Sequence, residues 1–244
     1  MLRLNNITKR FGELKVLDNF TYHVPRNKIT ALVGPNGAGK TTLFNIITGM
    51  LNQDNGKVHL QTEDITSLGM HKISKLGVSR VFQQVTCFKN LTVKEHLMLC
   101  FEDSKRFSFN LSRRKKLNRK RMKALKGVLR LVGLSKPLDS LAVELSYGQK
   151  KLLGLAMAIL KPHKVLLLDE PVAGVNPILK KKIQDILLSL KSNGETIFVV
   201  EHDMNFVKGV ADEVVVLNNG KILASGEPEK VLKNKKVVEA YLGE

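Results

Sequence analysis

Short apolar runs alternate with segments of helical periodicity over much of the chain. The runs at residues 165–169, 196–200 and 213–217 read VLLLD, TIFVV and EVVVL, and helix-like segments follow Pro177 and Asp203. Strands that are apolar on both faces and separated by helices are typical of a mostly parallel sheet covered by those helices. The pattern therefore predicts an α/β core.

Two other parts of the chain depart from this alternation. The first residues, LRLNNITKRFG and then VLDNFTYHV, predict an N-terminal antiparallel β part with turns at 9–14 and 25–28. From about residue 90 to residue 160 the periodicity is helical. We expect one domain over residues 1–244: a core with a β subdomain at about 1–89 and 161–244, and an inserted α-helical subdomain at about 90–160.

The composition is that of a globular protein, since 43% of the residues are hydrophobic and can form a sizeable core. No run approaches the roughly 18 apolar residues needed to span a bilayer, and MLRLNNITKR lacks the apolar middle of a secretion signal. We therefore expect a chain that stays in the cytoplasm. Cys87 and Cys100 have no metal-like spacing, so neither a disulfide framework nor a zinc site is expected.

The net charge of +18 is large for 244 residues and first suggests nucleic acid as a partner. The densest basic run is RRKKLNRKRMKALK, Arg113–Lys126, and no aromatic residues interleave it as stacking platforms for single strands. Leu117, Met122 and Leu125, with Leu129 beyond them, weakly fit one face of a helix. The run is therefore interpreted as a solvated helical face or a contact with anionic lipid headgroups or an acidic partner. Lysine-rich genome composition would also explain it.

The sequence GPNGAGKT, from Gly34 to Thr41, stands between an apolar strand and a helix-like segment. Its glycines let backbone N–H groups converge on phosphate oxygens at a helix N-terminus. Lys40 would reach the β and γ phosphates of a bound nucleotide, and the Thr41 hydroxyl would bind Mg²⁺. The predicted nucleotide-binding residues of this loop are Gly34, Asn36, Gly37, Gly39, Lys40, Thr41 and Thr42.

An Asp-Glu pair follows the apolar run 165–168. The run places Asp169 at the carboxyl end of a strand, where an open parallel sheet binds its ligand. Asp169 is predicted to hold Mg²⁺, and Glu170 to polarise the attacking water as general base.

A third motif, LSYGQ, precedes KKLLGLAMAIL, which predicts a helix that Ser146 caps. A helix N-terminus with a serine hydroxyl and a glycine N–H is a second anion site. Since the chain already has one phosphate loop, a second site is useful if it serves the nucleotide of another copy.

Together these motifs resemble an ATP-binding subunit of an ABC transporter over essentially the whole chain, with LSYGQ in place of the family's LSGGQ. The resemblance implies a P-loop ATPase fold and a dimer, of two copies or of two similar subunits. Each ATP would lie between one phosphate loop and the partner's signature helix, at Ser146, Gly148 and Gln149. The dimer would dock on integral membrane permease subunits at the inner face of the cell membrane.

Further positions match the family motifs. Phe11 corresponds to the aromatic residue that stacks on adenine, and His202 to the histidine that touches the γ-phosphate. Gln83 corresponds to the glutamine that contacts Mg²⁺ and the attacking water; Gln84 is the alternative, but the family motif has its glutamine directly after the aromatic residue.

Several details resemble the branched-chain amino acid importer ATPases, namely LSYGQ, EPVAGVNP, VEHDMNFV and the ending VVEAYLGE. The resemblance implies import of branched-chain or related amino acids. Gly154 and Met157 stand where that subgroup often has Glu and Arg, which puts the stability of the signature helix in question. The alternatives are an ATPase for urea or amide import, for lipopolysaccharide or drug export, or, less favoured, a nucleic-acid-associated ABC ATPase.

Overall fold

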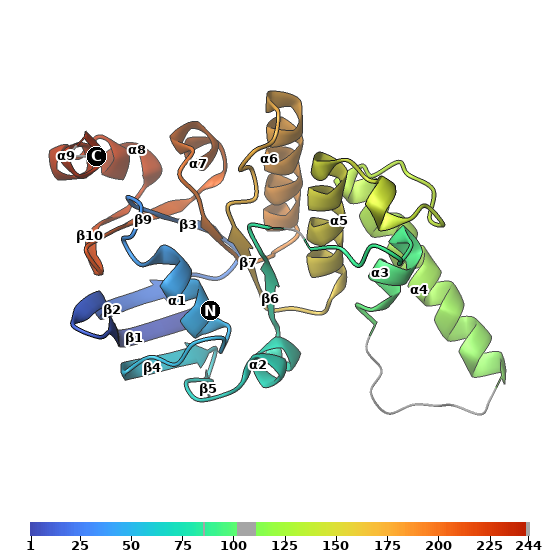
Figure 1. The fold of residues 1–244 in the computed structure, drawn as a ribbon, viewed down its shortest axis with the longest axis horizontal. Helices are drawn as coiled ribbons and strands as arrows, with labels where there is room; N and C mark the ends of the chain where they lie inside the picture. Colours follow the sequence, from blue (N-terminus) through green and yellow to red (C-terminus); the bar gives the residue numbers. More distant parts are fainter. Residues whose placement is uncertain (85, 102–110, 243–244) are drawn as a thin grey trace. The chain divides into compact units, whose positions relative to one another are not determined.

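The computed structural model describes residues 1–84, 86–101 and 111–242, with only the backbone described at 111–116 and 241–242. It contains two compact units (Figure 1). We call Met1–Gln83 with His163–Glu244 the core unit, and Gln84–Pro162 the helical unit. The sequence-based expectation for the inserted part was about 90–160.

A six-stranded sheet forms the centre of the core unit, in the order β10-β9-β3-β8-β7-β6. Its strands pair in parallel except β10, which is antiparallel to β9. The predicted α/β fold with a mostly parallel sheet is thereby confirmed. The strands are β3 (Ile29–Val33), β6 (Val78–Val81), β7 (Val165–Asp169), β8 (Ile197–Val200), β9 (Glu213–Asn218) and β10 (Lys221–Gly226).

The N-terminal part forms a separate antiparallel sheet in the order β2-β1-β4-β5. The turn between its first two strands contains Gly12 with φ 59°, a conformation that glycine adopts without steric cost. The predicted antiparallel part is thus present. Its strands are β1 (Leu2–Phe11), β2 (Leu14–Val24), β4 (Asn55–Leu60) and β5 (Glu63–Asp64).

Two helices of the core unit, α6 and α7, begin at side-chain caps where the sequence predicted helices. Asn176 accepts the N–H of Leu179 at 2.8 Å ahead of α6, and Asp203 accepts the N–H of Phe206 at 2.9 Å ahead of α7. Three short helices, α2, α8 and α9, were not predicted, because each is too short for its periodicity to stand out. The helices are α1 (Lys40–Ile47), α2 (Met70–Leu76), α6 (Pro177–Ser192), α7 (Met204–Val210), α8 (Pro228–Leu232) and α9 (Lys235–Leu242).

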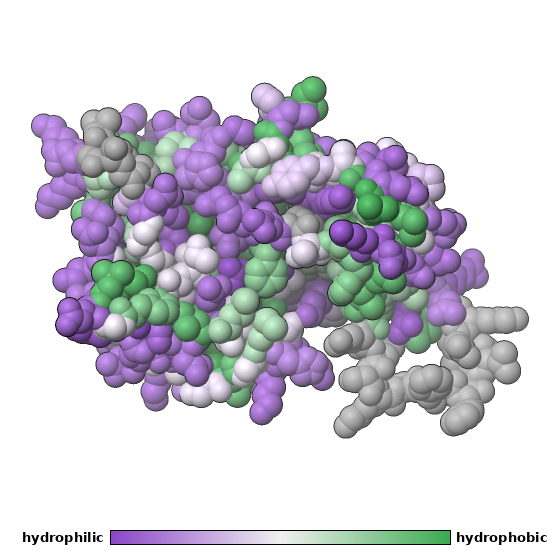
Figure 2. All heavy atoms as spheres, viewed as in Figure 1, coloured by the Kyte–Doolittle hydropathy of each residue, from purple (hydrophilic) through white to green (hydrophobic). Residues whose placement is uncertain are grey.

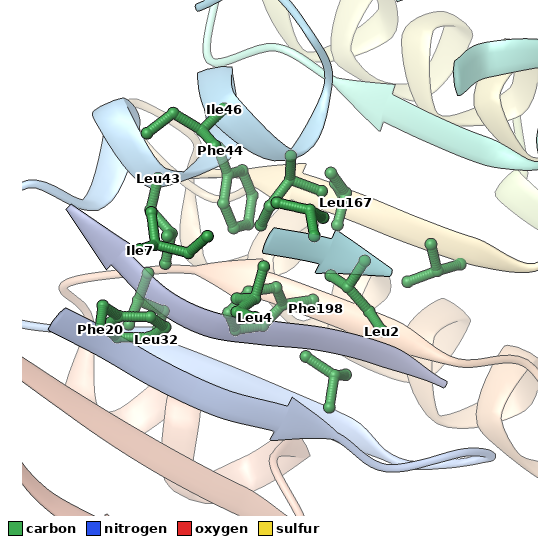
Figure 3. Close-up of a cluster of buried hydrophobic side chains, with 14 of the residues drawn as sticks. Leu2, Leu4, Ile7, Phe20, Leu32, Leu43, Phe44, Ile46, Leu167 and Phe198 are labelled. Carbon is green, nitrogen blue, oxygen red and sulfur yellow. The ribbon is translucent and has the colours of Figure 1, made fainter. Parts of the chain in front are cut away.

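The hydrophobic core of this unit joins both sheets through α1. Leu43 and Phe44 of α1 point toward side chains of β1 and of the parallel sheet (Figure 3). The rings of Phe44 and Phe198 lie 5.2 Å apart, between centroids. The helix that follows the phosphate loop is therefore held from both sides. At the surface, hydrophilic residues cover most of the viewed face, and apolar ones form small groups (Figure 2).

The helical unit contains α3 (Val93–Met98), α4 (Leu111–Val132), a 3₁₀ turn (Ala142–Glu144) and α5 (Tyr147–Leu160). Leu125 and Leu129 of α4 are buried, as the proposed apolar face requires. Leu117 is 40% exposed, so the buried face of the helix does not extend to this residue. None of the helices in the described ranges is long and apolar enough to cross a membrane.

Candidate active site

The pairing register of the parallel sheet brings four strand ends to one edge. Leu32 of β3 and Asp169 of β7 both pair with Val200 of β8, and Val81 of β6 pairs with Leu168. Parallel strands present their carboxyl ends on the same side, so the residues after them gather there. The predicted phosphate loop, Asp-Glu pair, glutamine and histidine all follow these strand ends.

The phosphate loop turns sharply between β3 and α1, and two of its glycines are required. A Cβ atom on Gly34 would lie 2.1 Å from the carbonyl oxygen of Leu217, and φ is 155°. Gly39 caps α1 with φ 106°, and a Cβ there would lie 2.7 Å from the carbonyl oxygen of Val16. These glycines allow the backbone to curl so that its N–H groups can approach a phosphate.

Lys40 lies within the loop, and its ammonium group donates to two loop carbonyls. The Nζ distances are 2.6 Å to Gly34 O and 2.8 Å to Pro35 O, and the residue is 9% exposed. The side chain is therefore anchored where the loop closes on itself. Asn36, Gly37 and Thr41 are exposed and Thr42 is half-buried, so this end of α1 is open to a ligand.

Asp169 forms a buried ion pair with Arg80 of β6. Arg80 Nη2 donates to Asp169 Oδ2 at 2.6 Å, and Nη1 donates to Asn45 Oδ1 at 2.8 Å. The side chains of the pair are 5% and 7% exposed. The Phe82 ring lies 4.6 Å from the guanidinium carbon. Arg80 compensates the carboxylate's charge, and it links β6, β7 and α1.

Glu170 lies next to Gln83 and His202. Gln83 Nε2 donates to Glu170 Oε2 at 2.6 Å, and His202 Nδ1 lies 3.9 Å from Glu170 Oε1. The histidine side chain is 61% exposed, so water can reach the group. Glu170 has φ 46°, which a non-glycine residue adopts only when its surroundings hold it there. It is Gln83, of the two adjacent glutamines, that reaches this carboxylate.

The polar groups at this edge fit a magnesium ion. Thr41 offers a hydroxyl, Gln83 an amide and Asp169 a carboxylate, and Arg80 engages Oδ2 of that carboxylate. Hard oxygen donors of this kind are those that Mg²⁺ prefers.

Phe11, at the end of β1, is 50% exposed, and Lys9 Nζ lies 5.6 Å from its ring centroid. An exposed aromatic ring in this position is free on much of its surface to stack on a planar ligand.

The signature residues belong to the helical unit, where they start α5. Ser146 Oγ accepts the N–H of Gln149 at 3.3 Å, and Gln149 Oε1 accepts the N–H of Ser146 at 3.0 Å. This capping box explains why the helix begins at this point. The predicted cap at Ser146 is confirmed, and α5 continues without a break through Gly154 and Met157. Gly148 lies in the first turn.

The sequence pattern alone does not single out Arg80. Its signal is a charged residue inside VSRV, a short strand whose neighbouring positions Val78, Ser79 and Val81 are buried. An arginine in such a strand needs a buried partner, which directs attention to the nearest carboxylate on the adjacent strand.

A phosphate loop after β3 and an Asp-Glu pair at the end of β7, both on the same edge of the sheet, with a capped helix that begins at LSYGQ, define an ATP-binding cassette. A family model described as ABC transporter matches residues 17–173, and one described as branched-chain amino acid ATP-binding cassette transporter matches residues 221–244. A probable branched-chain amino acid transport ATP-binding protein, LivG of Archaeoglobus fulgidus, is 39% identical over 246 residues, which cover 100% of this chain and 95% of that protein. The chain belongs to the ABC transporter family, among its branched-chain amino acid transport ATP-binding subunits, and the resemblance drawn from its motifs is confirmed.

Solved structures agree with this assignment. An ATP-binding cassette of an ABC transporter in its ADP conformation superposes with a TM-score of 0.85 at 36% identity, covering 100% of this chain and 99% of that one. A dimeric cassette in a post-hydrolysis state, bound to ADP and phosphate, gives a TM-score of 0.79 at 25% identity over 93% of this chain and 99% of that chain.

Proposed function

We propose that this chain hydrolyses ATP to ADP and phosphate and so energises the import of branched-chain or related amino acids through a membrane transporter. Hydrolysis is supported mainly by the group of Glu170, Gln83 and His202, which lies at the sheet edge where the phosphate loop begins. The names of the full-length relatives support the amino acid as cargo.

In this proposal the loop binds ATP through backbone N–H groups from Gly34 to Thr42, including those of Asn36, Gly37 and Gly39. Lys40 exchanges its bonds to loop carbonyls for the β and γ phosphates, and Phe11 stacks on the adenine.

Thr41, Asp169 and Gln83 would hold Mg²⁺, which would neutralise charge on the phosphates. Glu170 takes a proton from the attacking water, and Gln83 orients that carboxylate. His202 contacts the γ-phosphate and stabilises the charge that develops there.

The Glu170→Gln variant tests the catalytic assignment. The amide keeps the shape of the side chain but cannot act as a base, so turnover should fall by roughly 10²- to 10⁴-fold while ATP affinity stays unchanged. Glu213→Gln is the matched control. Glu213 is the first residue of β9, so it lies at the edge of the parallel sheet opposite to the carboxyl strand ends that form the site. Turnover by Glu170→Gln at the rate of Glu213→Gln would contradict the assignment.

We propose further that two subunits close on ATP, each supplying Ser146, Gly148 and Gln149 to the nucleotide on its partner. The dimeric relative bound to ADP and phosphate supports this. Lys40→Ala removes a loop lysine and Ser146→Arg blocks a signature helix, so each variant alone should be inactive. A mixture should regain activity, because a mixed dimer contains one intact loop facing one intact signature. A mixture that stays inactive would exclude sites shared between two chains.

The transport assignment includes permease subunits and a location at the inner face of the membrane. Cells that lack the gene should lose uptake of radiolabelled leucine, isoleucine and valine, and the wild-type gene should restore it where the Glu170→Gln gene does not. Unchanged uptake of these amino acids, with a defect in urea or amide uptake or in export of lipid or drug, would replace the cargo and keep the ATPase.

The charge of the helical unit favours a contact with anionic lipid. This unit holds 18 Lys and Arg against 5 Asp and Glu, so it carries most of the net charge. The side chains of Arg113–Lys116 lie outside the described residues, but Lys120, Lys123 and Lys126 are exposed on α4. Basic residues near an anionic surface contribute about 1 kcal/mol each.

Changing Lys120, Lys123 and Lys126 to Gln should therefore weaken binding to vesicles that contain phosphatidylserine by roughly 10- to 100-fold. The matched control changes Lys233, Lys235 and Lys236, which are exposed on the core unit, to Gln and removes the same charge. Equal losses in both variants would show that only net charge matters. Steeply salt-dependent binding to DNA or RNA, with none to vesicles, would favour a nucleic-acid partner instead.

A further inference from the structure

Glu201 is a carboxylate buried in the core unit directly after β8. Its exposed fraction is 0%, and the four residues of the strand before it are apolar and buried. Burial raises the pKa of this carboxyl group, and hydrogen bonds from backbone N–H groups oppose that shift. A buried carboxylate is costly unless it is hydrogen-bonded, so its contacts indicate what it does.

The two oxygens of Glu201 bind different segments of the chain. Oε1 accepts the N–H of Val172, at 3.0 Å, from the loop that follows β7. Oε2 accepts the N–H of His202 at 3.2 Å and, more weakly, that of Asp203 at 3.5 Å. The backbone N–H of Glu201 donates to Leu32 O of β3 at 3.3 Å. One residue thus connects the ends of β3, β7 and β8.

The residues held in this way flank the catalytic group of the proposed function. Val172 lies two residues after Glu170, whose left-handed backbone needs support from its surroundings. His202 follows Glu201 directly. The Glu170 N–H also donates to Val200 O at 3.0 Å. The segment from Glu170 to Val172 is therefore hydrogen-bonded both to the last residue of β8 and to Glu201, which follows it.

We propose that Glu201 is a positioning residue, which holds Glu170 and His202 at their working separation by binding the backbone of both loops. The inference rests on the proposed roles of those two residues. Glu201 touches neither nucleotide nor water in this assignment. Its effect is expected on the rate of hydrolysis and not on ATP binding.

The Glu201→Gln variant removes one of the two acceptors with little change of volume. Its NH₂ group would face backbone N–H donors, so either Val172 or His202 loses its partner. We expect kcat to fall by roughly 10- to 100-fold, because small displacements of reacting groups are costly, while the Kd for ATP changes less than twofold. Glu201→Met, apolar and of similar length, gives the same readout if the glutamine variant does not fold.

A double-mutant cycle with His202→Ala separates positioning from general stability. Because the proposed effect is on the separation between Glu170 and His202, and His202→Ala removes one member of that pair, Glu201→Gln should lower kcat clearly less in the His202→Ala background than in the wild type. The same fold-loss in both backgrounds, or an unchanged kcat in Glu201→Gln, would overturn the proposal. Failure of the proposed function is recognised separately, since His202→Ala or Glu170→Gln alone would then keep full turnover.

Discussion

Replacing Arg80 with methionine should strongly destabilise the core unit, even though the change removes no charge from the surface. The variant leaves the carboxylate of Asp169 buried, with 7% of its side chain exposed and its hydrogen bond from Nη2 lost. Removal of one partner from a buried ion pair costs about 3 to 5 kcal/mol. The loss of the hydrogen bond to Asn45 acts in the same direction.

For a chain of this size that cost corresponds to a fall in Tm of roughly 6 to 20 °C. Thermal unfolding followed by circular dichroism, without nucleotide, measures it. Lys181→Met is the matched control, because Lys181 pairs with Asp185 at 3.0 Å on the surface with 64% and 59% of the side chains exposed. Such a pair contributes about 0.5 kcal/mol or less, so Tm should hardly move.

The double variant Arg80→Met with Asp169→Asn gives the decisive comparison. The neutral amide is cheaper to bury without a cation, so the double variant should be less destabilised than the sum of the two single changes. A Tm of Arg80→Met within about 2 °C of the wild type, or strict additivity in the double variant, would refute the reasoning that the buried pair governs this edge of the sheet.

Three further predictions concern backbone space, thiol reactivity and pH. Gly34→Ala should abolish ATP binding or folding because its Cβ has no room, whereas Gly127→Ala, in open space on α4, should raise Tm slightly; calorimetry with and without ATP compares them. Burial raises the pKa of Cys100 to about 11, so its alkylation rate by iodoacetamide should still rise tenfold per pH unit between about pH 7.5 and 9.5; a plateau would contradict this. The hydrogen bond from Lys28 lowers the pKa of Glu213, so its stabilisation exists at neutral pH and is lost as pH falls through the lowered value. Glu213→Gln should therefore cost up to about 1 kcal/mol in urea unfolding at pH 7 and less at pH 3, and an equal cost at both would refute the linkage.

Much of the site follows from local sequence. The glycines, lysine and threonine of GPNGAGKT are adjacent in the chain, and so are Asp169 and Glu170, so their order alone indicates their chemistry. Ser146 and Gln149 form a capping box because their spacing matches one turn of helix. Short helices such as α2, in which only Ile73 is buried, leave too little periodicity to be predicted.

The remaining features depend on which strands are neighbours. The sequence by itself determined the phosphate loop, the Asp-Glu pair, the signature helix and the alternation that makes a parallel sheet, because each is encoded within one segment. Only the tertiary structure decided that Arg80 would meet Asp169, and that Glu201 would bind the loop at Val172. Those contacts join residues far apart in the chain, and the strand order β3-β8-β7-β6 places them together. The physical reason is that a buried charge specifies the need for a partner, while the pairing of strands selects which partner it receives.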